Sequence, residues 1–220
     1  MVSSGDPVSI TTLAAENLDK SFSGPPLFSG LDLRAERGLV AVTGRNGSGK
    51  TTLLKILAGL MRPTSGRVRV ERDGRALDDP ERRLAVGWAG PDLALYGELT
   101  AEENLAFFRR AAGRTASRED IRRRLSEAGL AEESFGRRVE EYSTGMRQRL
   151  RIAFATLFDP PLLLLDEPTA GLDAEGRAMA LGVIDRARRQ GAVVVASNDE
   201  RDVTAPETRI ELGGRGIGKR

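Results

Sequence analysis

The 220-residue sequence contains no cysteine and no histidine. The first absence excludes disulfides, thiolate metal ligands and thiol nucleophiles, and it suits a reducing compartment. The second absence excludes imidazole general bases and histidine-bound metals. A metal site in this chain would therefore use carboxylate and hydroxyl oxygens, which favour Mg²⁺.

Net charge and long apolar runs are also limited. The formal net charge is only +2, so no strong global field selects a polyanionic partner. No apolar run approaches membrane-spanning length, and residues 1–12 lack the basic-then-apolar pattern of a signal peptide. We therefore expect a cytoplasmic chain whose residues 1–220 form a single domain with a proper core.

Short apolar runs predict several strands in the first third of the chain. They lie at residues 8–18, 27–35, 38–44 and 66–74. The segment after residue 50 has leucines at helical spacing up to Leu60, so we expect a helix there. Pro63 and Gly66 mark the end of that helix before the next strand.

Two capping signals predict helices in the middle of the chain. Thr100 followed by Glu103 is a capping box, and Ser117 followed by Asp120 repeats the pattern. Residues 100 to about 156 are therefore expected to be wholly helical. The strands expected around this block lie at residues 84–88, 162–166 and 193–195. This order predicts an α/β core with a helical insertion.

The segment GRNGSGKT, residues 44–51, matches the phosphate-binding pattern G-x-x-x-x-G-K-[ST]. Its glycines let the backbone amides point inward, while Lys50 would reach the β- and γ-phosphates and Thr51 would ligate Mg²⁺. Chance alone would give this pattern in roughly 1% of chains this long. The apolar strand before it and the helix after it favour a nucleoside triphosphate site. The residues expected to bind nucleotide here are Gly44, Arg45, Asn46, Gly47, Ser48, Gly49, Lys50, Thr51 and Thr52.

The segment LLLLDEP, residues 162–168, supplies two acids at the end of an apolar strand. Asp166 would hold the Mg²⁺ shell, and Glu167 would orient or deprotonate an attacking water. Taken alone, the segment could equally be a buried strand followed by an acidic helix cap. The phosphate-binding pattern at residues 44–51 favours the catalytic interpretation.

The segment EYSTGMRQRLRIAFA, residues 141–155, resembles the signature of the ATP-binding subunits of ABC transporters. Ser143 and Gly145 occupy the signature positions, and Met146 stands where many members carry glutamine. A serine hydroxyl, a glycine amide and a helix amino terminus form an anion site. The resemblance implies a P-loop NTPase core with a small antiparallel β subdomain and a helical subdomain at about residues 92–156. It also implies ATP and Mg²⁺ as ligands.

The same resemblance implies two kinds of protein partner. In this family two chains pair head to tail, so that Ser143 and Gly145 of each chain close the ATP site of the other. The resemblance also implies integral-membrane transporter subunits, with this chain peripheral on the inner face of the cell membrane. Phe22 sits where the family stacks an aromatic on adenine, although a lone phenylalanine is more often part of the core. The loop 170–173 resembles the one that crosses the dimer interface.

The sequence departs from the family pattern at two positions. The loop after the strand at 84–88 normally presents a glutamine, and here Asp92 is the nearest candidate substitute. Asn198 stands where the family usually has a histidine that contacts the γ-phosphate. An asparagine amide can still donate a hydrogen bond to phosphate, but it cannot carry a positive charge. Asn198 could instead cap the following turn, and we favour the phosphate contact because its spacing from Glu167 fits the family.

Three functions are compatible with these features. The segments SITTLAAENLDKSF, PLFSGLDL and YSTGMRQRL most resemble the ATPase of the haem exporter used in cytochrome c maturation, with ABC-2-type exporter ATPases close behind. A soluble ABC ATPase that does not serve transport is the second possibility, and an ATP-binding switch with little hydrolysis is the third. We expect no nucleic-acid partner, because acidic residues interrupt the arginine runs and no aromatic residues interleave with them.

Overall fold

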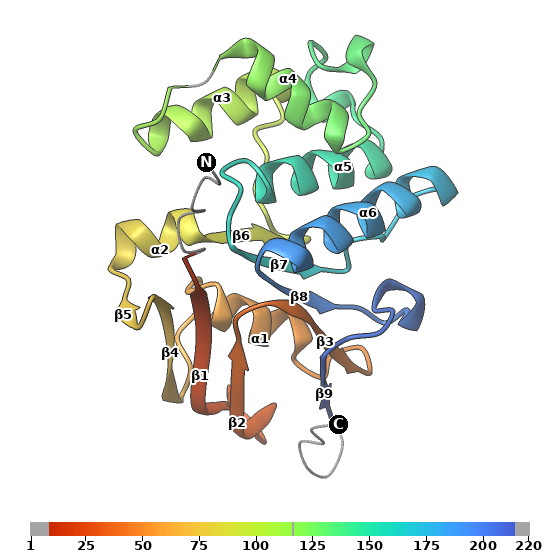
Figure 1. Ribbon diagram of the computed structural model, residues 1–220. Coiled ribbons are helices and arrows are strands. Elements are labelled where there is room, and N and C mark those ends of the chain that lie inside the picture. The colour runs from red at the N-terminus through yellow and green to blue at the C-terminus, as the bar shows by residue number, and fades with distance from the viewer. Residues whose placement is uncertain (1–8, 116, 214–220) are drawn as a thin grey trace, which may run out of the picture.

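A five-stranded parallel sheet lies at the centre of the computed structural model, which describes residues 9–115 and 117–213 (Figure 1). Its strand order is β6-β7-β8-β3-β9, and every neighbouring pair is parallel. The strands are β3 (Gly38–Gly44), β6 (Val86–Ala89), β7 (Leu162–Asp166), β8 (Ala192–Ala196) and β9 (Thr208–Leu212). Every residue of β7 and β8 is buried, as continuous Leu and Val runs require in a sheet covered on both faces.

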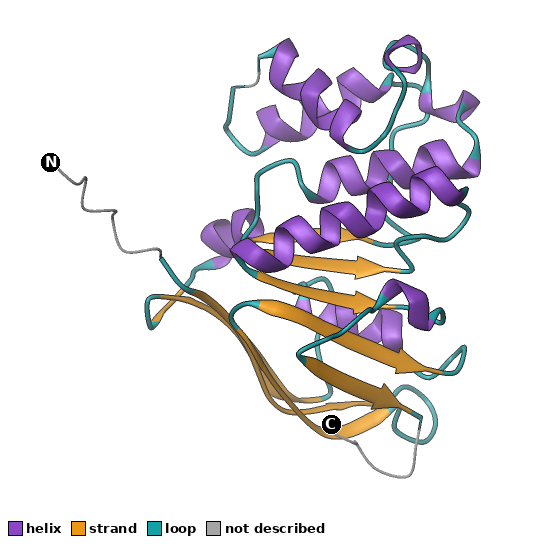
Figure 2. Cartoon of the chain, turned by 45° about the vertical axis from the view of Figure 1, so that its right-hand side comes forward, coloured by secondary structure: helices purple, strands orange, loops and turns teal. Residues whose placement is uncertain are grey.

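Two long helices cover one face of this sheet (Figure 2). They are α5 (Thr144–Ala155) and α6 (Ala174–Gln190). Ile152 of α5 and Ile184 of α6 pack with Val193 and Val195 of β8 in one buried cluster. Asp173 caps α6 by accepting a hydrogen bond from the Gly176 amide at 2.8 Å.

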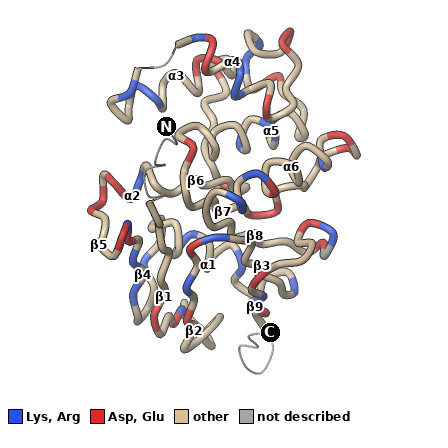
Figure 3. Tube along the Cα trace, viewed as in Figure 1, with Lys and Arg blue, Asp and Glu red and all other residues tan. Residues whose placement is uncertain are grey.

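The helical block between β6 and β7 is built from short helices rather than one continuous run. Its helices are α3 (Ala101–Ala111), α4 (Arg118–Glu127) and α5, with 3₁₀ turns η1 (Glu132–Ser134) and η2 (Val139–Glu141). The Thr100–Glu103 capping box and the Ser117 cap are both present. The prediction that residues 100 to about 156 are wholly helical was wrong, because Gly113 and Gly129, with φ of 69° and 72°, follow the ends of α3 and α4 and non-helical segments separate the helices. Arginines are interspersed here with acids along the chain (Figure 3).

The second sheet is antiparallel and has the order β2-β1-β4-β5. Its strands are β1 (Thr11–Lys20), β2 (Phe28–Ala35), β4 (Ser65–Arg72) and β5 (Arg75–Ala76). This sheet and the parallel sheet confirm the predicted fold class, a P-loop core with a small antiparallel β subdomain and a helical insertion.

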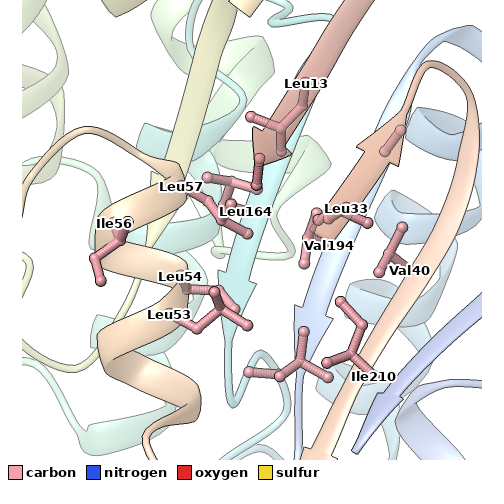
Figure 4. Close-up of a cluster of buried hydrophobic side chains, with 14 of the residues drawn as sticks. Leu13, Leu33, Val40, Leu53, Leu54, Ile56, Leu57, Leu164, Val194 and Ile210 are labelled. Atoms are coloured by element: carbon pink, nitrogen blue, oxygen red, sulfur yellow. The ribbon is translucent and has the colours of Figure 1, made fainter. Parts of the chain in front are cut away.

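Helix α1 (Lys50–Leu57) lies between the two sheets. Leu53 and Leu54 point into the main hydrophobic core, where Leu33 comes from the antiparallel sheet and Val194 from the parallel sheet (Figure 4). The helix is shorter than predicted. Gly59, with φ 78°, terminates it, and Leu60 is 61% exposed instead of continuing the buried stripe.

The segment before the helical block also differs from the sequence prediction. The strand predicted at residues 84–88 begins only at Val86, because the preceding residues form helix α2 (Asp79–Ala85). Asp78 and Glu81 form a complete capping box at its start, so this helix carried a recognisable sequence signal.

Within the described part of the chain, no helix is both long and apolar enough to cross a membrane.

Candidate active site

The loop between β3 and α1 has backbone geometry that only glycine accepts. Gly44, Gly47 and Gly49 have φ values of 146°, 80° and 98°. A Cβ on Gly44 would lie 2.4 Å from the Leu212 carbonyl oxygen, so no side chain fits there. The loop therefore curls back on itself at the start of α1, as an anion-binding turn requires.

Lys50 is the first residue of α1 and is only 6% exposed. Its ammonium group donates to the Gly44 carbonyl at 2.9 Å and to Oδ1 of Asn198 at 2.8 Å. These contacts hold the cation across the mouth of the loop. The pocket in front of it is lined by Leu27, Asn46, Gly47, Gly49, Lys50, Thr51, Thr52, Asp166, Glu167 and Asn198.

Thr51 and Asp166 meet although 115 residues separate them. The Thr51 hydroxyl donates to Oδ2 of Asp166 at 2.6 Å, and Asp166 is 2% exposed. Its other oxygen, Oδ1, is buried without a hydrogen-bond partner. Burial raises the pKa of Asp166, and the hydrogen bond from Thr51 opposes that rise.

This donor set fits Mg²⁺. A hydroxyl oxygen and a carboxylate oxygen without a partner are hard ligands of the kind that this ion prefers. The described residues contain no group of three or more acidic side chains that could enclose a metal by themselves. Phosphate and water oxygens would therefore complete the shell, as is usual for Mg²⁺ at nucleotide sites.

Glu167 follows β7 in a strained turn with φ 49°. Its amide donates to the Ala196 carbonyl at 2.8 Å, and its own carbonyl accepts from Nε2 of Gln148 at 3.1 Å. Burial raises the pKa of the Glu167 carboxyl, and the hydrogen bond from the Asn198 amide opposes the shift. A raised pKa brings a carboxylate closer to the range in which it accepts a proton well.

Asn198 faces the phosphate loop. Its Nδ2 donates to Oε1 of Glu167 and to Oδ1 of Asn46, both at 2.7 Å, while its Oδ1 accepts from Lys50. The turn that follows is capped by Ser197 and Asp199 instead. The Asn198 side chain therefore faces Lys50, Asn46 and Glu167 and does not cap the turn, which was the alternative that the sequence left open.

A buried acid holds the segments after β7 and β8 together. Asp202 is 1% exposed and accepts hydrogen bonds from Ser197 at 2.6 Å and from Thr169 at 2.8 Å. Arg177 of α6 pairs with it at 2.6 Å. Because Ser197 precedes Asn198 and Thr169 follows Glu167 closely, Asp202 fixes the spacing of the two site residues. The sequence interpretation missed Asp202. Nothing in the neighbouring sequence distinguishes it from any other acidic residue close to Asn198.

The signature residues line a different pocket. Ser143 caps α5 by accepting from the Met146 amide at 3.2 Å. Ser143 and Gly145 line a hollow together with residues 129–131 and 171–173, and this hollow shares no residue with the pocket in front of Lys50. One chain therefore does not bring the signature onto its own phosphate loop.

The remaining predicted residues lie outside the hydrogen-bonded centre. Phe22 is 60% exposed, and the Lys20 ammonium lies 4.7 Å from its ring centroid. It does not line the pocket in front of Lys50. Asp92 pairs with Lys55 of α1 at 2.6 Å. Arg45 lines a neighbouring hollow between β3 and β9.

A family model described as ABC transporter matches residues 28–170. The chain belongs to the ABC transporter family. It is 36% identical over 216 residues to the daunorubicin resistance ATP-binding protein DrrA3 of Streptomyces coeruleorubidus, covering 94% of this chain and 67% of the relative. It is also 36% identical over 205 residues to the cytochrome c biogenesis ATP-binding export protein CcmA of Mesorhizobium japonicum, covering 92% and 99%.

Solved structures agree with this membership. A dimeric, post-hydrolysis state of the ATP-binding cassette MJ0796, bound to ADP and Pi, matches with a TM-score of 0.82 at 27% identity. The match covers 94% of this chain and 98% of that one. The predicted resemblance is thus confirmed: this ABC protein is a transporter ATP-binding subunit and an ATPase.

Proposed function

We propose that this ABC ATPase hydrolyses Mg²⁺–ATP to drive export through separate membrane subunits. The observation that carries the proposal is the convergence of Lys50, the Thr51–Asp166 pair and Glu167 on one pocket. These are the groups that phosphoryl transfer to water needs: charge neutralisation, a metal shell and a group that directs the nucleophile.

Each residue has a distinct part in the proposed reaction. Lys50 and the loop amides bind the phosphates, and Asn198 donates its amide to the γ-phosphate. Thr51 and Asp166 would hold Mg²⁺, which supplies neutralisation of the phosphate charge. Glu167 accepts the proton of the attacking water, and the surrounding hydrogen bonds keep its carboxylate directed at that water.

A second copy of the chain completes the site. Ser143 and Gly145 lie at the amino terminus of α5, where backbone amides and the helix dipole attract an anion. Their pocket is separate from that of Lys50, so a head-to-tail homodimer would bring each signature to the other chain's phosphate. The dimeric state of the MJ0796 cassette supports this arrangement.

The membrane partner would dock on an apolar groove beside α2 and β6. The groove is lined mainly by apolar side chains, among them Leu60, Leu84, Trp88, Leu93, Phe154 and Phe158. Asp92 and Leu93 also belong to the turn that follows β6, so a partner in this groove would touch a segment adjacent to the nucleotide site. The chain would then act as a peripheral protein on the inner face of the membrane.

For the transported substrate we propose haem, in the context of cytochrome c biogenesis. The name of the CcmA relative, whose full length this chain nearly covers, supports that proposal. The name of DrrA3, at equal identity, points instead to daunorubicin resistance. We infer no nucleic-acid partner, because arginines of the helical block pair with acids, such as Arg118 and Arg122 with Glu102.

An ATP-binding switch with little hydrolysis is the second candidate. The observation in its favour is Asn198, a neutral amide between Lys50 and Glu167 where the family usually has a histidine. Measured turnover separates the two candidates, because a switch binds ATP and hydrolyses almost none.

Co-purification tests the transport function. We expect this chain to purify from detergent extracts with a polytopic membrane protein that stimulates its ATPase activity after reconstitution. Leu60→Asp should lose both association and stimulation, because it places a charge on the exposed rim of the groove. Ile10→Asp, at an exposed apolar residue next to β1, is the matched control and should keep both. Stimulation that survives Leu60→Asp would contradict docking at this groove.

A further inference from the structure

Arg151 of α5 reaches from the signature helix to the turn after β6. Its Nη2 donates to the Pro91 carbonyl at 3.2 Å, and its Nη1 donates to Oε1 of Gln148 at 3.3 Å. This is the turn in which Asp92 is the nearest candidate for the glutamine that the family normally presents. In this chain the guanidinium of Arg151, on helix α5, contacts the turn.

Gln148 continues the connection to the catalytic segment. It is 6% exposed, and its Nε2 donates to the carbonyls of Glu167 and Pro168 at 3.1 Å each. The Glu167 carbonyl also accepts from the Ala170 amide at 3.1 Å. Gln148 therefore fixes the strained turn that aims the Glu167 carboxylate.

We propose that Arg151 and Gln148 form a relay through which the turn at residues 90–94 positions Glu167 for hydrolysis. The proposal rests on the proposed function, because it assigns regulation to the same site. Arg151 and Gln148 are positioning residues: Gln148 touches the backbone of Glu167 and Pro168, Arg151 touches Gln148 and the Pro91 carbonyl, and neither lines the pocket in front of Lys50. Movement of the turn when a partner fills the groove beside it would pass along three hydrogen-bonded steps, from Pro91 to Arg151, to Gln148 and to Glu167.

Packing alone accounts poorly for Arg151. Its Nε is buried without a hydrogen-bond partner, and burial lowers the pKa of the guanidinium. An unpaired buried N–H destabilises a fold, so an apolar side chain would serve better if the position only joined α5 to its neighbours. The turn itself is held from its other side by the Lys55–Asp92 pair, and Arg151 links it by a hydrogen bond to α5.

Two measurements on the full-length chain test the relay. The first is steady-state ATPase kinetics of Arg151→Ala, Gln148→Ala and the double variant. We expect kcat to fall about ten-fold in each single variant, with KM within about two-fold, because orientation rather than binding is lost. The double variant should fall no further than the worse single variant, since serial elements are not additive.

The second measurement is amide hydrogen exchange at residues 167–170 in the nucleotide-free protein. Arg151→Ala should exchange about ten-fold faster there, because the turn loses an anchor. Arg124→Ala is the matched control. It removes a similarly shielded guanidinium, paired with Asp159, that does not touch the turn, and it should leave both kcat and this exchange unchanged.

The outcomes separate the relay from the proposed function. Unchanged exchange at residues 167–170 in Arg151→Ala would overturn the relay, as would kcat losses that multiply in the double variant. A wild-type chain without ATPase activity would instead contradict the proposed function, and the exchange comparison would still decide whether Arg151 holds the turn.

Discussion

The side-chain amide of Asn198 bridges Lys50 and Glu167, accepting from the lysine at 2.8 Å and donating to the carboxylate at 2.7 Å. A neutral group thus connects the cation that binds phosphate to the acid that directs water. A bound γ-phosphate would compete for both Lys50 and the amide. The bridge therefore offers a way for nucleotide binding to release the Glu167 carboxylate for catalysis.

This bridge predicts the effect of replacing Asn198. Asn198→Ala should lower turnover roughly ten- to hundred-fold, because a preorganised donor to developing charge is lost. Asn198→His should raise turnover above that of the wild type, because an imidazolium adds charge. Thr204→Ala, at an exposed residue of the same segment, is the control. If Asn198→Ala left ATP affinity and turnover unchanged, Asn198 would have no part in the site.

Replacement of Lys50 tests the phosphate-binding loop at residues 44–51. Lys50→Ala should weaken ATP binding at least about hundred-fold, because a charge-assisted contact to phosphate is lost from a shielded pocket. Equilibrium titration with a fluorescent ATP analogue measures the change. Arg34→Ala, an exposed cation of the antiparallel sheet, should bind like the wild type. Binding retained in Lys50→Ala would mean that nucleotide occupies another site.

The buried carboxyl of Asp166 predicts a pH-dependent gain in stability on its removal. Burial raises its pKa in the native chain above the ordinary value of 3.8, so the native state keeps its proton to higher pH than the unfolded state. The nucleotide-free protein accordingly loses stability as pH rises from 3.8 through the raised pKa. Asp166→Asn avoids this loss and should raise the free energy of unfolding at pH 7 by about 1–2 kcal/mol.

Urea unfolding between pH 4 and pH 8 measures this effect. The advantage of Asp166→Asn should shrink toward zero as pH falls to the ordinary aspartate range. An advantage that grows on acidification would contradict a raised pKa of Asp166 in the native chain. Addition of Mg²⁺–ATP should stabilise the wild type and not the variant, since Asn cannot supply a carboxylate ligand.

The buried contacts of Asp202 predict a large loss of stability when this residue is replaced. Asp202→Ala leaves the hydroxyls of Ser197 and Thr169 and part of Arg177 without their buried acceptor, which should cost about 3 kcal/mol. Asp185→Ala removes an exposed acid that pairs with arginines on α6 and should cost less than about 1 kcal/mol. The free energy of unfolding of both variants is measured by urea unfolding. Equal losses would show that the buried contacts of Asp202 stabilise the fold no more than the surface pairs of Asp185.

Much of the fold could be predicted from the sequence because its signals are local. The run at residues 162–166 became β7, and the glycines around Lys50 shaped the loop as expected. Helix α2 was missed although its capping box was visible, because the apolar residues 84–88 were interpreted as one strand. Strand β9 was missed because its five residues alternate weakly, and its place depends on pairing with β3.

The contacts that organise the site could be predicted only in part. Thr51 and Asp166 were expected near one metal because the phosphate-loop pattern fixes their roles. Gln148, Arg151 and Asp202 were not expected, because each acts on backbone or side chains that are distant in sequence. Nothing local distinguishes Arg151 from the other arginines of α5. The packing of that helix against the turn after β6 brings its guanidinium to the Pro91 carbonyl.

The role of Glu167 is tested most directly by the steady-state Mg²⁺-ATPase activity of the purified chain beside Glu167→Gln. We expect measurable turnover in the wild type and a loss of about hundred-fold or more in Glu167→Gln, with ATP still bound, because the amide cannot accept the proton of the attacking water. Equal activity in the two proteins would contradict the assignment of Glu167 as the group that directs hydrolysis.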